Sequence, residues 1–260
     1  MLKLAANLSM LFTEWPLRDR FAAARDAGFD AVELQFPYAE PADVLARAAE
    51  AAGIEVALIN APIGPDPASL GLACLPGAAD LFRSELERGF RYAMALGSPC
   101  INVLAGRSGA ADWAEGLDRV VERLAMAAEL CTAHGVTPLL EALNPADRPD
   151  YCVTDFETAV SVLRRTGAHV RLQFDVYHAT RMGLDPCEAW ERWRPHVGHV
   201  QIADCAGRHE PGTDRVDWRA VFNAIRASDY AGWVGAEYVP LSGTLSGLGW
   251  RSLLAGVTTT

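Results

Sequence analysis

Short apolar segments that resemble strands alternate with amphipathic segments that resemble helices along the whole chain. The strand-like segments are residues 2–7, 31–36, 54–60, 100–106, 136–143, 170–176, 197–204 and 232–239. Helical patterns lie between them, at residues 16–28, 41–53, 78–97, 112–134, 155–166, 186–194 and 217–227, with a weaker one after the last strand. Strict alternation of this kind predicts right-handed βαβ units and a parallel sheet buried on both faces.

Eight such units in 260 residues predict an α/β fold with one closed (β/α)₈ or TIM barrel domain. We expect this domain to span residues 1–256 and residues 257–260 to form a disordered tail. An open, doubly wound sheet is the alternative. The sequence lacks G-x-G-x-x-G after its first strand and lacks the Walker-type G-x-x-x-x-G-K-[ST], which favours the barrel.

The charge and the cysteines narrow the class of protein further. The net charge is −10, whereas nucleic-acid-binding surfaces usually carry an excess of basic residues. Six scattered cysteines without a C-x-x-C pair indicate reduced thiols rather than a disulfide framework or a zinc site. No run approaches the roughly 20 apolar residues of a membrane helix. We therefore expect a cytoplasmic protein without nucleic-acid or membrane partners. Both a monomer and a homo-oligomer are compatible with the sequence.

Polar residues lie in or at the ends of the last four strand-like segments. Glu141 ends an apolar run, and Asp175, Gln201 and Glu237 hold corresponding places in the next three. A single such residue is more often salt-bridged or loop-facing than functional. Four in consecutive strands would meet at the carboxyl-end mouth of a barrel, where the active sites of this fold lie. The series therefore predicts a site at the mouth.

The chemistry of these four residues indicates a divalent cation. Three clustered carboxylates would repel one another unless a cation lay among them. Two glutamates, one aspartate and one glutamine form an all-oxygen set, which suits Mg²⁺ or Mn²⁺ better than Zn²⁺. We expect one such ion per chain.

Three further residues are candidates for substrate binding. His178 follows Asp175 by three residues and could bond a substrate oxygen or orient Glu141. Arg208 and Arg107 follow the seventh and fourth strands, and either could hold a substrate anion with two hydrogen bonds. The alternative for each is an ordinary solvated loop residue.

Several motifs together resemble the hydroxypyruvate isomerase family of xylose isomerase-like TIM barrels. They are "ANLSMLF", "FPY", "GLACLPG", "INVLAG", "EALN", "FDVYH", "HVQIAD", "EPGT" and "GWVGAEY", and the similarity runs from residue 1 to about residue 254. The resemblance implies that the metal-binding positions are Glu141, Asp175, Gln201 and Glu237. It also implies that Glu141 and Glu237 exchange the proton in catalysis.

The activity that the resemblance implies is the interconversion of hydroxypyruvate and tartronate semialdehyde through a metal-stabilised enediolate. Its substrate is thus a small hydroxy-oxo acid. Relatives that act as epimerases usually have histidine where Gln201 stands, so glutamine indicates the isomerase branch. Leu70, Ala78 and Val239 occupy positions that are commonly basic in the family, which leaves the exact substrate open.

Other activities stay open as alternatives. Isomerisation of 2-oxotetronate and 3-epimerisation of a ketose belong to the same superfamily. An endonuclease IV-like phosphodiesterase is more remote, because it needs several histidine ligands for clustered zinc and a basic DNA-binding face. A non-catalytic, carbohydrate-binding barrel is the alternative from another class.

Overall fold

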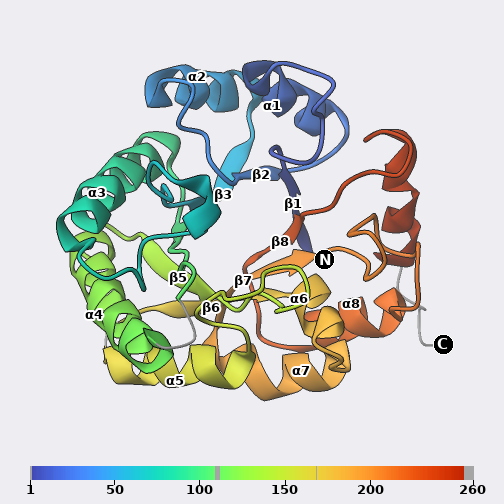
Figure 1. Cartoon of the computed structure of the whole chain (residues 1–260). Coiled ribbons are helices and arrows are strands. Elements are labelled where there is room, and N and C mark those ends of the chain that lie inside the picture. The colour runs from blue at the N-terminus through green and yellow to red at the C-terminus, as the bar shows by residue number, and fades with distance from the viewer. Residues whose placement is uncertain (1, 109–111, 168, 255–260) are drawn as a thin grey trace.

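Eight parallel strands close into a barrel in the order β1 to β8 (Figure 1). The structure is a computed structural model and describes residues 2–108, 112–167 and 169–254. The strands are β1 Lys3–Asn7, β2 Ala31–Leu34, β3 Glu55–Asn60, β4 Cys100–Asn102, β5 Thr137–Glu141, β6 Arg171–Asp175, β7 Val197–Ile202 and β8 Trp233–Ala236. β1 pairs with β8, with Ala5 opposite Gly235, so the predicted barrel is confirmed and the open sheet is excluded. The predicted tail at residues 257–260 lies outside the described residues.

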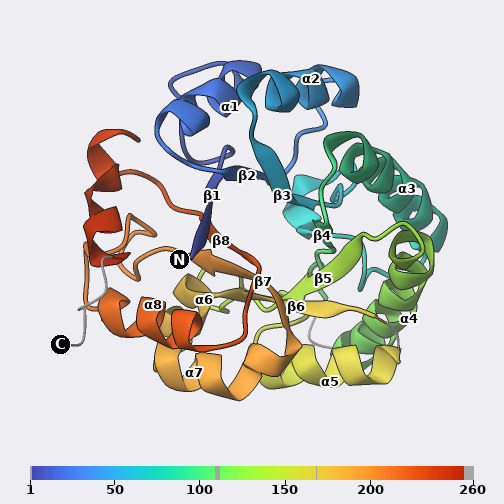
Figure 2. The same cartoon turned by 180° about the vertical axis from the view of Figure 1, so that it is seen from behind.

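A ring of helices covers the outside of the barrel (Figures 1 and 2). They are α1 Leu17–Asp26, α2 Ala42–Ala52, α3 Ala79–Leu96, α4 Trp113–Thr132, α5 Phe156–Thr166, α7 Pro186–Trp193 and α8 Trp218–Ala227. The short helix α6 Val176–Arg181 lies inside this ring. The described residues also form the 3₁₀ helices η1 Pro67–Ser69, η3 Arg194–His196 and η4 Ser246–Leu254. Among the described residues, none of the helices has the length and apolar character that crossing a membrane requires.

The helix ends follow local sequence signals. α2 begins after Pro41, whose fixed φ suits a helix start, and ends at Gly53, which adopts the left-handed conformation with φ 61°. α5 begins at Asp155, whose side chain accepts a hydrogen bond from the backbone N–H of Thr158. These signals account for the close agreement between expected and observed boundaries.

The largest differences from the expectation concern β4 and the segment after β6. β4 ends at Asn102, and residues 103–106 continue as a loop in which Ala105 forms an isolated bridge with Gly71. The short helix α6 was not expected, and it begins directly at the end of β6. Asp175 starts it, because its Oδ1 accepts a hydrogen bond of 2.8 Å from the backbone N–H of Tyr177. This helix brings His178 to the mouth of the barrel.

Candidate active site

The carboxyl ends of strands β5 to β8 bring the four predicted metal-binding residues to one mouth. Glu141 and Asp175 end β5 and β6, Gln201 lies in β7, and Glu237 follows the last residue of β8. All four side chains are buried, with residue exposures between 1% and 6%. Asp175 and Gln201 are register partners of neighbouring strands. The structure therefore collects residues that are separated by as many as 96 positions in the sequence.

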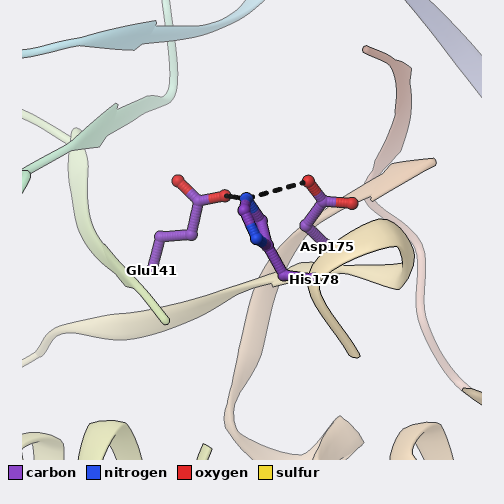
Figure 3. A group of neighbouring side chains, drawn as sticks. All are labelled: Glu141, Asp175 and His178. Atoms are coloured by element: carbon purple, nitrogen blue, oxygen red, sulfur yellow. Dashed lines mark ion pairs between the residues drawn. The ribbon is translucent and has the colours of Figure 1, made fainter. Parts of the chain in front are cut away.

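Glu141, Asp175 and His178 form a compact cluster (Figure 3). Each of them offers one ligand-type atom, and these atoms all lie within 4.8 Å of one another. Nε2 of His178 lies 3.8 Å from Oε1 of Glu141 and 3.7 Å from Oδ2 of Asp175. This buried cluster could hold a metal ion.

The hydrogen bonds of His178 define what its ring can do. Its Nδ1 accepts a bond of 3.0 Å from the backbone N–H of Asn144. Burial, together with the charge of Arg208, lowers the pKa of His178 well below its usual value, so the ring is neutral. A neutral imidazole that accepts at Nδ1 carries its proton on Nε2. Within the cluster, the two carboxylates thus supply lone pairs and His178 supplies a hydrogen-bond donor.

Arg208 lies between two of the carboxylates. Its Nη2 donates to Oδ2 of Asp175 at 2.8 Å and also to Oε2 of Glu237, and its guanidinium lies 4.7 Å from the ring centroid of Tyr177. The backbone of Arg208 has φ 55°, a left-handed conformation that is uncommon outside glycine. Its carbonyl accepts a bond of 2.8 Å from the N–H of Val239. The loop after β7 is thus folded so that this guanidinium enters the mouth.

Burial raises the pKa of three carboxyl groups at the mouth, which favours their uncharged, protonated forms. Desolvation raises the pKa of Glu141 well above its usual value, and the charges of Glu237 and Asp175 add to the rise. Burial also raises the pKa of Glu237 to about 7, although Arg208 acts in the opposite direction. The pKa of Asp175 is raised by burial against the same opposing charge. Glu237 can therefore gain and release a proton near neutral pH.

Amide side chains fix the orientation of both glutamates. Oε2 of Glu141 accepts a bond of 3.1 Å from Nδ2 of Asn102. Oε1 of Glu237 accepts from Nδ2 of Asn7 at 3.0 Å and from Nε2 of Gln35 at 2.7 Å. Sequence reasoning did not identify Asn102 or Gln35 as part of the site, because an amide near a strand end has no distinctive pattern.

Gln201 makes its hydrogen bonds with side chains of β2 and β6. Its Nε2 donates to Oε1 of Glu33 at 2.8 Å, and its Oε1 accepts a bond of 2.6 Å from Nε2 of Gln173. Neither Glu33 nor Gln173 was identified from the sequence. A signal for Glu33 was present, because it lies inside the apolar segment "AVELQF" just as Glu141 lies in "TPLLEAL".

A small cavity opens above the carboxylates, with a volume of about 130 Å³. Its lining consists of Gln35, Phe36, Asn60, Ile63, Leu70, Leu104, Glu141, Leu143, Asp147, Arg148, His178, Arg208 and Glu237. As far as the described part of the chain extends, Arg107, Ala78 and Val239 are not in this lining. Arg107 instead bridges to Tyr151 through its backbone, and its N–H donates to the carbonyl of Ser69. Arg148 therefore accompanies Arg208 at the cavity.

An eight-stranded parallel barrel with buried carboxylates at its carboxyl-end mouth is the architecture of a TIM-barrel enzyme. Residues 21–252 match the family model of that description. The chain is 37% identical over 253 residues to hydroxypyruvate isomerase of Escherichia coli, and the match covers 96% of this chain and 98% of the relative. It is 39% identical over 251 residues to 2-oxo-tetronate isomerase of Cupriavidus necator, with 95% and 96% covered. The chain belongs to the hydroxypyruvate isomerase family of isomerases.

A solved structure shares this fold. The crystal structure of an AP endonuclease, family 2, from Brucella melitensis superimposes with a TM-score of 0.94 at 35% sequence identity. The match covers 97% of this chain and 98% of that chain. The whole barrel is thus shared, including the strands that carry the four predicted ligands.

Proposed function

We propose that this isomerase interconverts hydroxypyruvate and tartronate semialdehyde (2-hydroxy-3-oxopropanoate). The observation that carries the proposal is the pair Glu141 and Glu237, two buried carboxyl groups with raised pKa that line the same small cavity. The relative from Escherichia coli that bears this activity in its name supports the choice of substrate. The cavity of about 130 Å³ is of a size that suits a small acid.

The donor set at the mouth fits a hard divalent cation, Mg²⁺ or Mn²⁺. Glu141, Asp175 and Glu237 would hold it with carboxylate oxygens, and Gln201 with its amide oxygen. The raised pKa values of the carboxyl groups support this fit, because their ionised forms need a positive charge nearby. When bound, such an ion supplies Lewis-acid polarisation of carbonyl and hydroxyl oxygens and stabilises the negative charge of an enediolate. The single histidine differs from the several that clustered zinc in a phosphodiesterase would require.

The two glutamates would move the protons of the reaction. The C3 proton of hydroxypyruvate leaves to one carboxylate, the hydroxyl proton passes from O3 to O2, and the other carboxyl group delivers a proton to C2. Asn102 holds Oε2 of Glu141, which leaves Oε1 for proton transfer on the side of His178. On Glu237, Asn7 and Gln35 hold Oε1 and Arg208 donates to Oε2, so Oε2 would be the corresponding atom once Arg208 turns to the substrate. The fixed amides thus restrict each glutamate to one oxygen.

Three other side chains would bind the substrate. The Nε2–H of His178 would donate to a substrate oxygen, and Arg208 would hold the carboxylate of the acid. Arg107 was the other arginine expected from the sequence. The cavity lining favours Arg148 in its place, because Arg148 contributes to the wall.

The proposal is tested by proton NMR with the protein supplied with Mg²⁺ or Mn²⁺. Hydroxypyruvate should be consumed with formation of the aldehyde, with a higher kcat/KM than for C4 to C6 oxo acids and ketoses. The second candidate substrate is 2-oxotetronate, favoured by the relative from Cupriavidus necator. A higher kcat/KM for that C4 acid than for hydroxypyruvate would identify 2-oxotetronate as the substrate instead. Absence of turnover on all of these compounds would overturn the proposed reaction.

A further inference from the structure

Glu33 is a carboxylate buried inside the barrel, on β2, and the proposed reaction gives it no role. Its residue exposure is 0%. Oε2 accepts a bond of 2.7 Å from Nε2 of His199, and Oε1 accepts from Nε2 of Gln201 at 2.8 Å and from Nδ2 of Asn7 at 2.9 Å. A buried carboxylate is costly unless such partners are present. Packing alone therefore does not explain a carboxylate at position 33.

The neighbouring strand leaves room for this carboxylate. Gly235 on β8 faces it, and a Cβ at that position would overlap with Oε2 of Glu33. A side chain at position 235 would thus displace the carboxylate from its partners. The space for Glu33 is built into the barrel by the glycine.

Glu33 also determines the orientation of two amides. Both oxygens of the Glu33 side chain accept hydrogen bonds, and the NH₂ group of Gln201 faces Oε1 as one of the donors. The carbonyl oxygen of Gln201 then lies on the side of β6, where it accepts from Gln173. β6 is the strand that carries Asp175, the register partner of Gln201. Asn7 donates to both Glu33 and Glu237 through Nδ2, so the same carboxylate also holds the amide that orients Glu237.

We propose that Glu33 is a positioning residue that keeps the carbonyl oxygen of Gln201 on the side of β6, where this oxygen accepts from Gln173 and has a second lone pair for the cation. This inference rests on the proposed function, in which Gln201 is a ligand. If the Gln201 amide rotated by half a turn, it would present its NH₂ hydrogens on the side of β6, and these would repel a cation. His199 acts as the second partner that keeps the carboxylate in place.

The experiment is a titration of Mn²⁺ by isothermal calorimetry into the wild type and five variants: Glu33→Gln, Glu55→Gln, Gln201→Leu and two double variants. Glu33→Gln replaces the carboxylate by a group of the same shape that can also donate, so the Gln201 amide is free to rotate. We expect its Mn²⁺ affinity to fall by about 10- to 100-fold, the usual effect of losing a partner of a metal ligand. The exposed Glu55→Gln, at the first residue of β3, is the matched control and should bind as the wild type does.

Two double variants separate positioning from a general structural effect. In the Gln201→Leu background, Glu33→Gln should change the affinity by less than about threefold, because the residue through which it acts is gone. The exchanged pair, Glu33→Gln with Gln201→Glu, should recover tight binding, since position 201 then presents an oxygen in either orientation. Far-UV circular dichroism verifies folding, and Glu33→Asp, which withdraws the carboxylate by one methylene, replaces Glu33→Gln if that variant does not fold.

The possible outcomes distinguish the inference from the proposed function. A wild type that binds no Mn²⁺ would overturn the metal site, and this inference with it. Wild-type binding with an unchanged affinity in the Glu33 variant would overturn the inference alone. An equal loss with and without Gln201 would also overturn it, because Glu33 would then act by a different route.

Discussion

The Glu237→Gln variant should be more stable than the wild type at pH 8, but not at pH 5, when a chelator keeps divalent cations away. Burial raises the pKa of Glu237 to about 7, despite the nearby Arg208. Glutamine has nearly the shape of protonated glutamic acid and carries no charge. The variant therefore resembles the acid form of the wild type at every pH.

The size of the effect follows from the shift in pKa. The unfolded chain releases the Glu237 proton near pH 4.5, whereas the folded protein keeps it until about pH 7. The folded state thus binds more protons in this window, and the contribution of Glu237 to stability is present below pH 4.5 and lost as the pH rises through about 7. At about 1.4 kcal/mol per pKa unit, the loss amounts to about 3 kcal/mol. For a chain of this size it should lower Tm by roughly 6–12 °C.

Urea denaturation at pH 5, 6, 7 and 8, with EDTA present, measures the difference between variant and wild type. The difference cancels groups that both proteins share, such as His178, whose lowered pKa makes a contribution of opposite sign. Glu50→Gln, on an exposed position of α2, serves as the control and should show a difference that does not vary with pH. Adding Mn²⁺ should stabilise the wild type more than Glu237→Gln, because glutamine offers the ion no negative charge.

A difference that stays constant from pH 5 to pH 8 would refute this reasoning. It would mean that Glu237 is ionised throughout, and hence that the pairing with Arg208 outweighs burial. A variant that becomes less stable relative to the wild type at pH 8 would lead to the same conclusion. In either case the argument that Glu237 exchanges a proton near neutral pH would lose its support.

Glu141→Gln should lower kcat by about 10²- to 10⁴-fold, the usual contribution of a general acid–base group. Glu141→Gln and Glu237→Gln also separate the two proton steps in D₂O. The variant that lacks only the group that protonates C2 should still exchange C3 hydrogen for deuterium, which proton NMR detects. Full activity in either variant would contradict the assignment. Removing divalent cations with EDTA should abolish turnover, and Mg²⁺ or Mn²⁺ at 100 times its Kd should restore it and stabilise the protein by about 2.7 kcal/mol in denaturation experiments. Leu70→Arg should raise kcat/KM for hydroxypyruvate relative to neutral ketoses, because Leu70 lines the cavity, whereas Val239→Lys outside the lining should not; equal effects would refute the cavity assignment.

The barrel could be predicted from the sequence because each unit carries its own local signals. Apolar strands and amphipathic helices repeat with helix ends such as Gly53, and only a parallel, doubly covered sheet accommodates them. Helix α6 was missed because six residues are too few to show a helical period. Its start depends on Asp175, which was read as a ligand and also caps the helix. The position of Asp175 at the end of an apolar strand indicates a ligand, and it gives no sign of the helix that Asp175 caps.

The site was predictable where a polar residue interrupts an apolar strand. Glu141, Asp175 and Glu237 stood out in this way, and Glu33 offered the same signal without belonging to the consecutive series. The arginines offered no such signal. Arg148 lies at the cavity because its loop is held by Asp147, which accepts bonds from Asn144, Tyr177 and Arg181. These contacts join residues from separate elements, so the path of the loop could not be inferred from its own sequence.

The charges at the mouth also connect substrate binding to metal binding. Arg208 pairs with Asp175 and Glu237, and its guanidinium cannot satisfy both of them fully while it also holds the carboxylate of a substrate. The neutral His178 cannot replace its charge. A divalent cation can, because it would neutralise the same two carboxylates and release Arg208 toward the cavity. By thermodynamic linkage, the acid should then increase the affinity for the cation by the same factor as the cation increases the affinity for the acid. The ion would therefore prepare the binding of the substrate as well as its chemistry.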